Sequence, residues 1–165
     1  MQAKLRQTCL FTAVALGLVV GLAGTTLAQA GTPTNIGTWK LNLAKSTYSP
    51  GTAPTSATFT NVVAGAGVKT TTDSVAFDGT AIHSEYTVLY DGKDNPMTGN
   101  SRNGDLAAGT RLDANTVEFI YKNGGKVTIT QTGVVSSDGK TYTITARGTN
   151  TLGQTINTVA VYDRQ

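Results

Sequence analysis

The sequence is poor in the residues that build thiol, metal and aromatic sites. Its 165 residues include one cysteine, one histidine, one tryptophan and four prolines, and aromatic residues make up only 7% of the chain. The single cysteine, Cys9, lies in an apolar N-terminal segment. The remainder of the chain therefore has no disulfide, no thiol nucleophile and no thiolate metal ligand, and its stability must come from packing and backbone hydrogen bonds.

Charged residues are also few and nearly balanced. They make up 14% of the chain, with 13 basic and 10 acidic residues. Two of the basic residues, Lys4 and Arg6, lie in the N-terminal segment, so 11 basic residues remain against 10 acidic ones if that segment is removed. No basic stripe interleaved with aromatic residues is present, which argues against a nucleic-acid partner.

The first thirty residues have the pattern of a cleavable signal peptide. Lys4 and Arg6 give a positive start, residues 10–24 are apolar, and Ala28 to Ala30 have the small-x-small form that signal peptidases cut. We predict a signal peptide at residues 1–30, a mature domain at residues 31–165, a periplasmic or secreted location, and no membrane span after cleavage. An uncleaved leader that anchors the domain is the alternative, although glycines interrupt the short apolar run.

Helical periodicity is missing outside the leader, and β-strand patterns take its place. About nine short runs rich in Thr, Val, Ile and Tyr occur at hairpin spacing. Asx-Gly pairs at 78–79, 91–92, 123–124 and 138–139 lie between such runs and predict hairpin turns. Residues 43–54, with two prolines, hold at most one helical turn. We predict an all-β domain folded as a small antiparallel up-and-down β-barrel, because closure removes exposed edge strands.

Alternation along each strand predicts which side chains point into the barrel. The predicted inward sets are Trp39, Leu41 and Leu43; Ile82, Ser84, Tyr86, Val88 and Tyr90; Val117, Phe119 and Tyr121; Val127, Ile129 and Gln131; and Tyr142, Ile144 and Ala146. The last run, residues 156–164, is ambiguous in phase.

The lone tryptophan lies at the start of the first strand, two residues after a glycine. We predict that Trp39 seals one end of the barrel and that Gly37 lets the backbone approach closely. Arg164, on the last strand, is the arginine whose position suits stacking on the indole and hydrogen bonding to neighbouring carbonyls.

Both ends of the mature chain resemble a known family. "GTWKL" is similar to the Gly-x-Trp opening of lipocalins and fatty-acid-binding proteins, and "VAVYDRQ" resembles their last strand, which carries a tyrosine and a basic residue. The chain is more similar still to a group of bacterial secreted lipocalin-like proteins of largely unknown function, through "GTWKLNLAKSTYSPG", "YDGKDNPMTGN", "SSDGKTYTITARGTNTLGQ" and "VYDRQ". The resemblance implies a calycin-type barrel that binds or transports a small hydrophobic or amphipathic molecule. Ala160, two residues before Tyr162, replaces the arginine with which fatty-acid-binding proteins hold a carboxylate.

A cavity in such a barrel would be walled by the inward aromatic and aliphatic side chains, and tyrosine combines apolar area with an orienting hydroxyl. A void that reaches a mouth near Tyr86 and Tyr121 would favour a ligand-binding barrel, and close packing across the barrel would favour the alternative. The alternative is a filled barrel that acts through its surface as an envelope structural or protein-interaction module, meeting a partner through residues 91–104. The predicted ligand contacts are Phe59, Tyr86, Tyr90, Phe119, Tyr121, Ile129, Tyr142 and Ile144.

No catalytic motif is present, so we expect a protein without enzymatic activity, cofactor or metal. Alternation places His83 and Glu85 on the outer face, which favours solvated surface over a metal pair. Residues 91–100 are rich in oxygen ligands, but Lys93 interrupts them and no acid follows until Asp105. This favours a hairpin-end loop over a calcium site. An enzyme built on the barrel would need converging inward polar groups, and only Ser84 and Gln131 are candidates.

Overall fold

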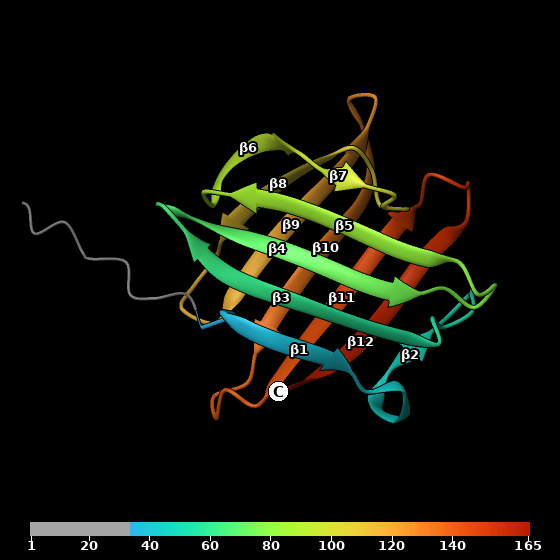
Figure 1. The fold of residues 1–165 in the computed structure, drawn as a ribbon, viewed down its shortest axis with the longest axis horizontal. Coiled ribbons are helices and arrows are strands. Elements are labelled where there is room, and N and C mark those ends of the chain that lie inside the picture. The colour runs from blue at the N-terminus through green and yellow to red at the C-terminus, as the bar shows by residue number, and fades with distance from the viewer. Residues whose placement is uncertain (1–33) are drawn as a thin grey trace, which may run out of the picture.

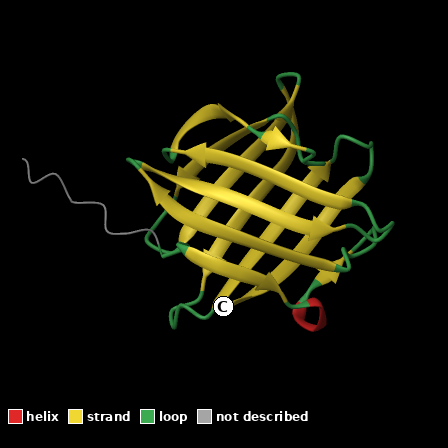
Figure 2. Cartoon of the chain, viewed as in Figure 1, coloured by secondary structure: helices red, strands yellow, loops and turns green. Residues whose placement is uncertain are grey.

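The described part of the chain, residues 34–165 of a computed structural model, folds into a nearly closed antiparallel β-barrel (Figure 1). The predicted signal peptide, residues 1–30, lies outside the described residues. One turn of 3-10 helix, η1 (Leu43–Lys45), interrupts the strands (Figure 2). The strands are β1 (Gly37–Leu41), β2 (Thr47–Tyr48), β3 (Ser56–Ala64), β4 (Gly67–Val75), β5 (Ala81–Val88), β6 (Asp91–Pro96), β7 (Thr98–Gly99), β8 (Leu106–Arg111), β9 (Thr116–Asn123), β10 (Lys126–Val135), β11 (Thr141–Thr149) and β12 (Thr155–Arg164).

Strands that are neighbours in the sheet are mostly neighbours in the sequence. The order is β6-β8-β9-β10-β11-β12-β1-β3-β4-β5-β7, with β2 beside β12. In Figure 1, β1, β3, β4 and β5 cross in front of β9 to β12. Trp39 on β1 pairs with Arg164 on β12 and with Phe59 on β3, so the first strand joins the last one to the rest of the sheet. The predicted antiparallel up-and-down barrel is confirmed, with short additional strands beyond the nine expected.

Residues 91–104 form the seam of the barrel. The prediction of a hairpin turn at 91–92 is wrong, because β6 pairs with β8 at one edge of the sheet while β7 pairs with β5 at the other edge. Asn100 extends the second contact: its backbone N–H donates to the His83 carbonyl (2.9 Å) and its side-chain amide to the Ala81 carbonyl (2.8 Å). The segment predicted as a hairpin-end loop therefore crosses from one edge of the sheet to the other.

The other three Asx-Gly pairs occupy turns between consecutive strands, as predicted. In the turn between β9 and β10, Asn123 pairs with Lys126, and Gly124 and Gly125 have φ values of 54° and 78°. Positive φ at both central positions is the geometry of a type I′ hairpin turn, which explains why this turn contains glycine.

Alternation predicts most inner faces correctly, and the exceptions have local causes. Leu43 is 44% exposed because β1 ends at Leu41 and the chain enters η1. Val127 is 60% exposed because the register between β9 and β10 shifts between Val127 and Ile129. Such a bulge inserts one residue and breaks the period of two.

The ambiguous last strand has a defined phase in the structure. Ala160 is buried on the inner face of β12, while Val159 is 41% exposed. Ile156 and Tyr162 pack against the buried core from the same inner side as Ala160. The strand was difficult to read because apolar residues occupy both of its faces.

Candidate ligand-binding site

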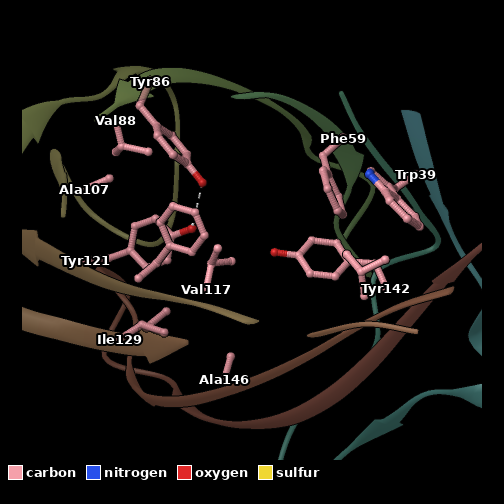
Figure 3. Packing of buried hydrophobic residues seen from close by; sticks show 12 residues of the cluster. Trp39, Phe59, Tyr86, Val88, Ala107, Val117, Tyr121, Ile129, Tyr142 and Ala146 are labelled. Carbon is pink, nitrogen blue, oxygen red and sulfur yellow. Dashed lines mark hydrogen bonds between the residues drawn. The ribbon is translucent and has the colours of Figure 1, made fainter. Parts of the chain in front are cut away.

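Trp39 closes one end of the barrel. Its side chain is fully buried, and its ring centroid lies 6.3 Å from that of Phe59 and 5.3 Å from that of Tyr142. Figure 3 shows these three rings as one group. The Arg164 guanidinium lies over the indole, 4.2 Å from the ring centroid. The stacking expected from the positions of the first and last strands is therefore present.

Arg164 also joins its own strand to two other segments of the closed end. Its guanidinium donates to the backbone carbonyls of Gly139 (2.6 Å), Ile36 (2.7 Å) and Thr34 (2.9 Å). At Gly37, where φ is 128°, an added Cβ would lie 2.6 Å from Arg164 Nη1. The arginine can therefore reach over the indole only because this position has no side chain.

A buried polar network lies beside the indole. Trp39 Nε1 donates to the Asn35 carbonyl (3.0 Å), which also accepts from the Asn61 side-chain amide (2.9 Å). The Asn35 side-chain amide donates to the Tyr90 hydroxyl (2.9 Å), and Arg111 lies 4.8 Å from the centre of the Tyr90 ring. Tyr90 follows the end of β5, with a φ of 57°. It belongs to the closed end, and not to the cavity to which the sequence assigned it.

The opposite end of the barrel contains a cavity of about 560 Å³. It opens between residues 50–54, the β4–β5 turn, residues 102–103 and the β11–β12 turn. Its inner wall is built from small and aliphatic side chains: Ala57, Ala76, Ile82, Ile129, Ile144, Ala146, Ile156 and Ala160. Amide and hydroxyl groups surround the mouth, from Asn103, Asn150, Gln154 and Thr155. The wall is therefore largely apolar, with Thr72, Ser74 and Gln131 as polar groups inside it and further polar groups at its entrance.

A smaller recess of about 110 Å³ shares part of this lining and extends toward the closed end. Thr72, Asn103, Gln131, Ile144 and Tyr162 line both spaces. Its remaining lining is mostly aromatic or polar: Phe59, Asn61, Thr70, Tyr86, Phe119, Tyr121 and Tyr142. Inside it, the hydroxyls of Tyr86 and Tyr121 are hydrogen-bonded at 3.1 Å (Figure 3).

The predicted ligand residues therefore fall into three groups. Ile129 and Ile144 line the large cavity, Tyr90 lies at the closed end, and the other five, Phe59, Tyr86, Phe119, Tyr121 and Tyr142, line the recess. The cavity does not open near Tyr86 and Tyr121, where a mouth had been expected for a ligand-binding barrel, since these side chains are only 7% and 3% exposed. They pack around Phe119, with which Tyr121 is stacked.

Burial makes the recess hydroxyls harder to ionise than those of exposed tyrosines. Desolvation raises the pKa of Tyr86 to about 12 and the pKa of Tyr121 well above its usual value. Both side chains are therefore neutral at physiological pH. The recess presents hydroxyl groups that donate or accept hydrogen bonds without carrying charge.

The mouth of the cavity is crossed by an ion pair. Arg102 Nη2 donates to Asp78 Oδ2 at 2.9 Å, and the Arg102 carbonyl accepts from the Thr151 backbone N–H at 2.9 Å. Hydrogen bonds from Thr80 first, and the Arg102 guanidinium in addition, lower the pKa of Asp78 to about 2. Arg102 therefore ties the β4–β5 turn to the β11–β12 turn, and the Asp78 carboxylate is ionised at neutral pH.

Polar residues of the cavity were mostly missed by sequence reasoning. Thr72, Ser74, Asn103, Asn150 and Gln154 all line it, and only Gln131 was singled out beforehand. Thr72 and Ser74 carry a usable signal, because they alternate with Thr70 along β4 and share its inner face. The loop residues carry none, since their position depends on how distant turns meet at the mouth.

His83 and Glu85 lie on the outer surface, as predicted. His83 Nδ1 is 2.7 Å from Asp73 Oδ1, and Glu85 pairs with Lys69 at 3.0 Å. Within residues 34–165, no group of three His, Cys, Asp or Glu side chains is arranged to hold a metal ion.

A scan against protein-family models and a search of curated proteins found no match to this chain. In the part of the chain that the structure describes, no helix has the length and apolarity needed to cross a membrane.

Proposed function

We propose that this protein binds or transports a small hydrophobic or amphipathic molecule in the bacterial envelope, acting in the periplasm or after secretion. The observation that carries the proposal is the cavity of about 560 Å³ at the end of the barrel opposite Trp39. Small-molecule sites are typically concave, mostly apolar and roughly 300–1,000 Å³ in volume.

The size of the cavity limits the size of its ligand. At about 30 Å³ per water-sized group, the space accommodates roughly 15–20 non-hydrogen atoms. At about 0.3 kcal/mol per atom, such a ligand gains about 4.5–6 kcal/mol, which corresponds to a dissociation constant of roughly 40–500 μM. A measurable affinity therefore requires no special contact beyond burial of the ligand.

The arrangement of the barrel supports a lipocalin-like binding protein over a filled surface module. A filled barrel would be closely packed along its whole axis, as it is around the fully buried Trp39. The other half of this barrel has an open interior with an apolar wall. Binding without catalysis is the simpler role, because the side chain of His83, the chain's only histidine, lies on the outer face of β5, where it pairs with Asp73.

Two measurements test the proposal. Native mass spectrometry of the protein purified from its own envelope is expected to reveal a small molecule of this size. Titration with the uncharged probe N-phenyl-1-naphthylamine is expected to give a saturable rise in fluorescence. Ala146→Phe should weaken probe binding at least roughly tenfold, because Ala146 is buried in the cavity wall and a phenyl ring there would occupy the space.

Thr145→Phe is the matched control, since the adjacent residue of β11 points away from the barrel interior. It should bind the probe as the unmodified protein does. A protein that carries no small molecule and does not bind the probe would refute the proposal. Equal binding by the Ala146→Phe and Thr145→Phe variants would refute the placement of the site.

A further inference from the structure

The cavity lining contains one charged side chain, and that charge is already paired. Among the described residues that line the cavity, the recess and a third space of about 120 Å³ beside them, only Arg102 is ionic. Its guanidinium is 2.9 Å from Asp78, and the Arg102 and Asp78 side chains are 20% and 39% exposed. A ligand entering the cavity therefore meets no unpaired cation.

Both members of the ion pair are fixed by the backbone. Asp78 Oδ1 accepts from the Thr80 backbone N–H at 3.0 Å, which holds the carboxylate in the β4–β5 turn. Arg102 is held through its carbonyl by Thr151. A ligand carboxylate at Arg102 would meet a guanidinium whose charge Asp78 already balances, and it would lie close to the Asp78 carboxylate, so the pair opposes binding of an anion at the mouth.

The interior offers hydrogen-bonding groups that are all neutral. Gln131 and Asn103 line both the cavity and the recess. The bond between the Tyr86 and Tyr121 hydroxyls uses only one of their two protons. These groups can satisfy a ligand hydroxyl, ester or amide. They cannot balance an ionised carboxylate, whose burial beside apolar walls costs far more than that of a neutral polar group.

We propose that the cavity selects uncharged amphiphiles, such as long-chain alcohols and esters, over the matching carboxylates. The reason is that Arg102, the only cationic side chain among the described residues of the cavity lining, is already paired with Asp78. The inference rests on the proposed function, since selection requires that the cavity binds a ligand. Ala160, which is buried in the cavity wall on the last strand, adds no charged group to the lining.

The test compares dodecanol with dodecanoic acid as competitors of N-phenyl-1-naphthylamine, at about pH 8, where the acid is ionised. The two competitors share one chain and differ in charge. The unmodified protein is expected to bind dodecanol at least roughly tenfold more tightly than dodecanoate.

Asp78→Asn frees the Arg102 guanidinium and keeps an Oδ1 acceptor for Thr80. Dodecanoate affinity should then rise roughly tenfold while dodecanol affinity changes little. Combining Asp78→Asn with Arg102→Gln should remove the gain, because the freed cation is then absent. Asp94→Asn is the matched control: it makes the same change in net charge, breaks an ion pair of 2.8 Å with Lys122, and alters a residue 38% exposed on the outer surface.

The outcomes separate the two proposals. If the protein does not bind the probe, and neither competitor binds, both the proposed function and this inference are refuted. Probe binding with equal affinity for dodecanol and dodecanoate refutes the inference alone. The inference is also refuted if the ratio of dodecanol to dodecanoate affinity is unchanged in Asp78→Asn, or if Asp94→Asn changes this ratio equally. In either case the Asp78–Arg102 pair would not set the selectivity.

Discussion

Replacing Arg164 by alanine tests whether the closed end of the barrel stabilises the whole domain. The guanidinium stacks on Trp39 and donates to carbonyls of Thr34, Ile36 and Gly139. These carbonyls lie at the start of the described chain and in the β10–β11 turn. One side chain from the last strand therefore holds together segments that are far apart in the sequence.

The expected cost follows from these contacts. Because the guanidinium is partly solvated, each of its three hydrogen bonds contributes about 0.5 kcal/mol, at the low end of the usual range. Stacking on the indole adds about 0.5–1 kcal/mol at an exposed site. The free energy of unfolding should therefore fall by about 2 kcal/mol in Arg164→Ala. Arg164→Lys should recover only part of this loss, since an ammonium cannot reach three carbonyls in one plane.

Urea unfolding followed by Trp39 fluorescence measures this difference, because the indole lies directly under the guanidinium. Arg147→Ala is the control, as Arg147 is an exposed arginine on β11. It should change stability by less than about 0.5 kcal/mol. A loss in the free energy of unfolding below about 0.5 kcal/mol in Arg164→Ala would contradict this reasoning, as would an Arg164→Lys variant as stable as the unmodified protein.

Two further predictions concern the turns and the acidic residues. Gly124→Val should lower the free energy of unfolding by roughly 1 kcal/mol or more, because a β-branched residue is strained at a φ of 54°; an unchanged melting temperature would be inconsistent with this. Hydrogen bonds hold the pKa of Asp78 near 2, and those of Asp113 and Asp138 below their usual value, in the folded protein. Their contribution is present where the carboxylates are ionised, so stability should be level above about pH 5 and fall as the pH approaches 2. Urea unfolding across this range checks the sign, and stability that increases on acidification would show that other groups dominate.

The barrel was predictable because its local signals agree with its global fold. Alternation on β5, β9 and β11 marks the inner faces, and three of four Asx-Gly pairs turn hairpins between neighbours. The position of Trp39 opposite Arg164 follows from pairing the first strand with the last one. These features depend on periods and turns that a short stretch of sequence displays by itself.

The seam was not predictable from the same signals. The pair at 91–92 has the residue types of a hairpin turn, yet the chain there leaves one edge of the sheet and pairs with β8 on the other edge. Whether this pair forms a hairpin depends on which strand edges of β5 and β8 remain unpaired in the sheet. That is a property of the closed sheet and not of the turn, so local turn chemistry could not reveal it.

The location of the cavity follows from the size of the inward side chains along three strands. Each carries an aromatic residue toward Trp39 and an alanine toward the mouth: Phe59 and Ala57 on β3, Tyr142 and Ala146 on β11, and Tyr162 and Ala160 on β12. Because inward side chains fill a small barrel where they are large, the end with rings is packed and the end with alanines is open. A search for ligand contacts among the largest inward residues therefore finds mainly the lining of the small recess. The space for a ligand lies where the inward positions are small, which is why Ala146, and not the recess tyrosines, is the position at which one larger side chain should exclude the ligand.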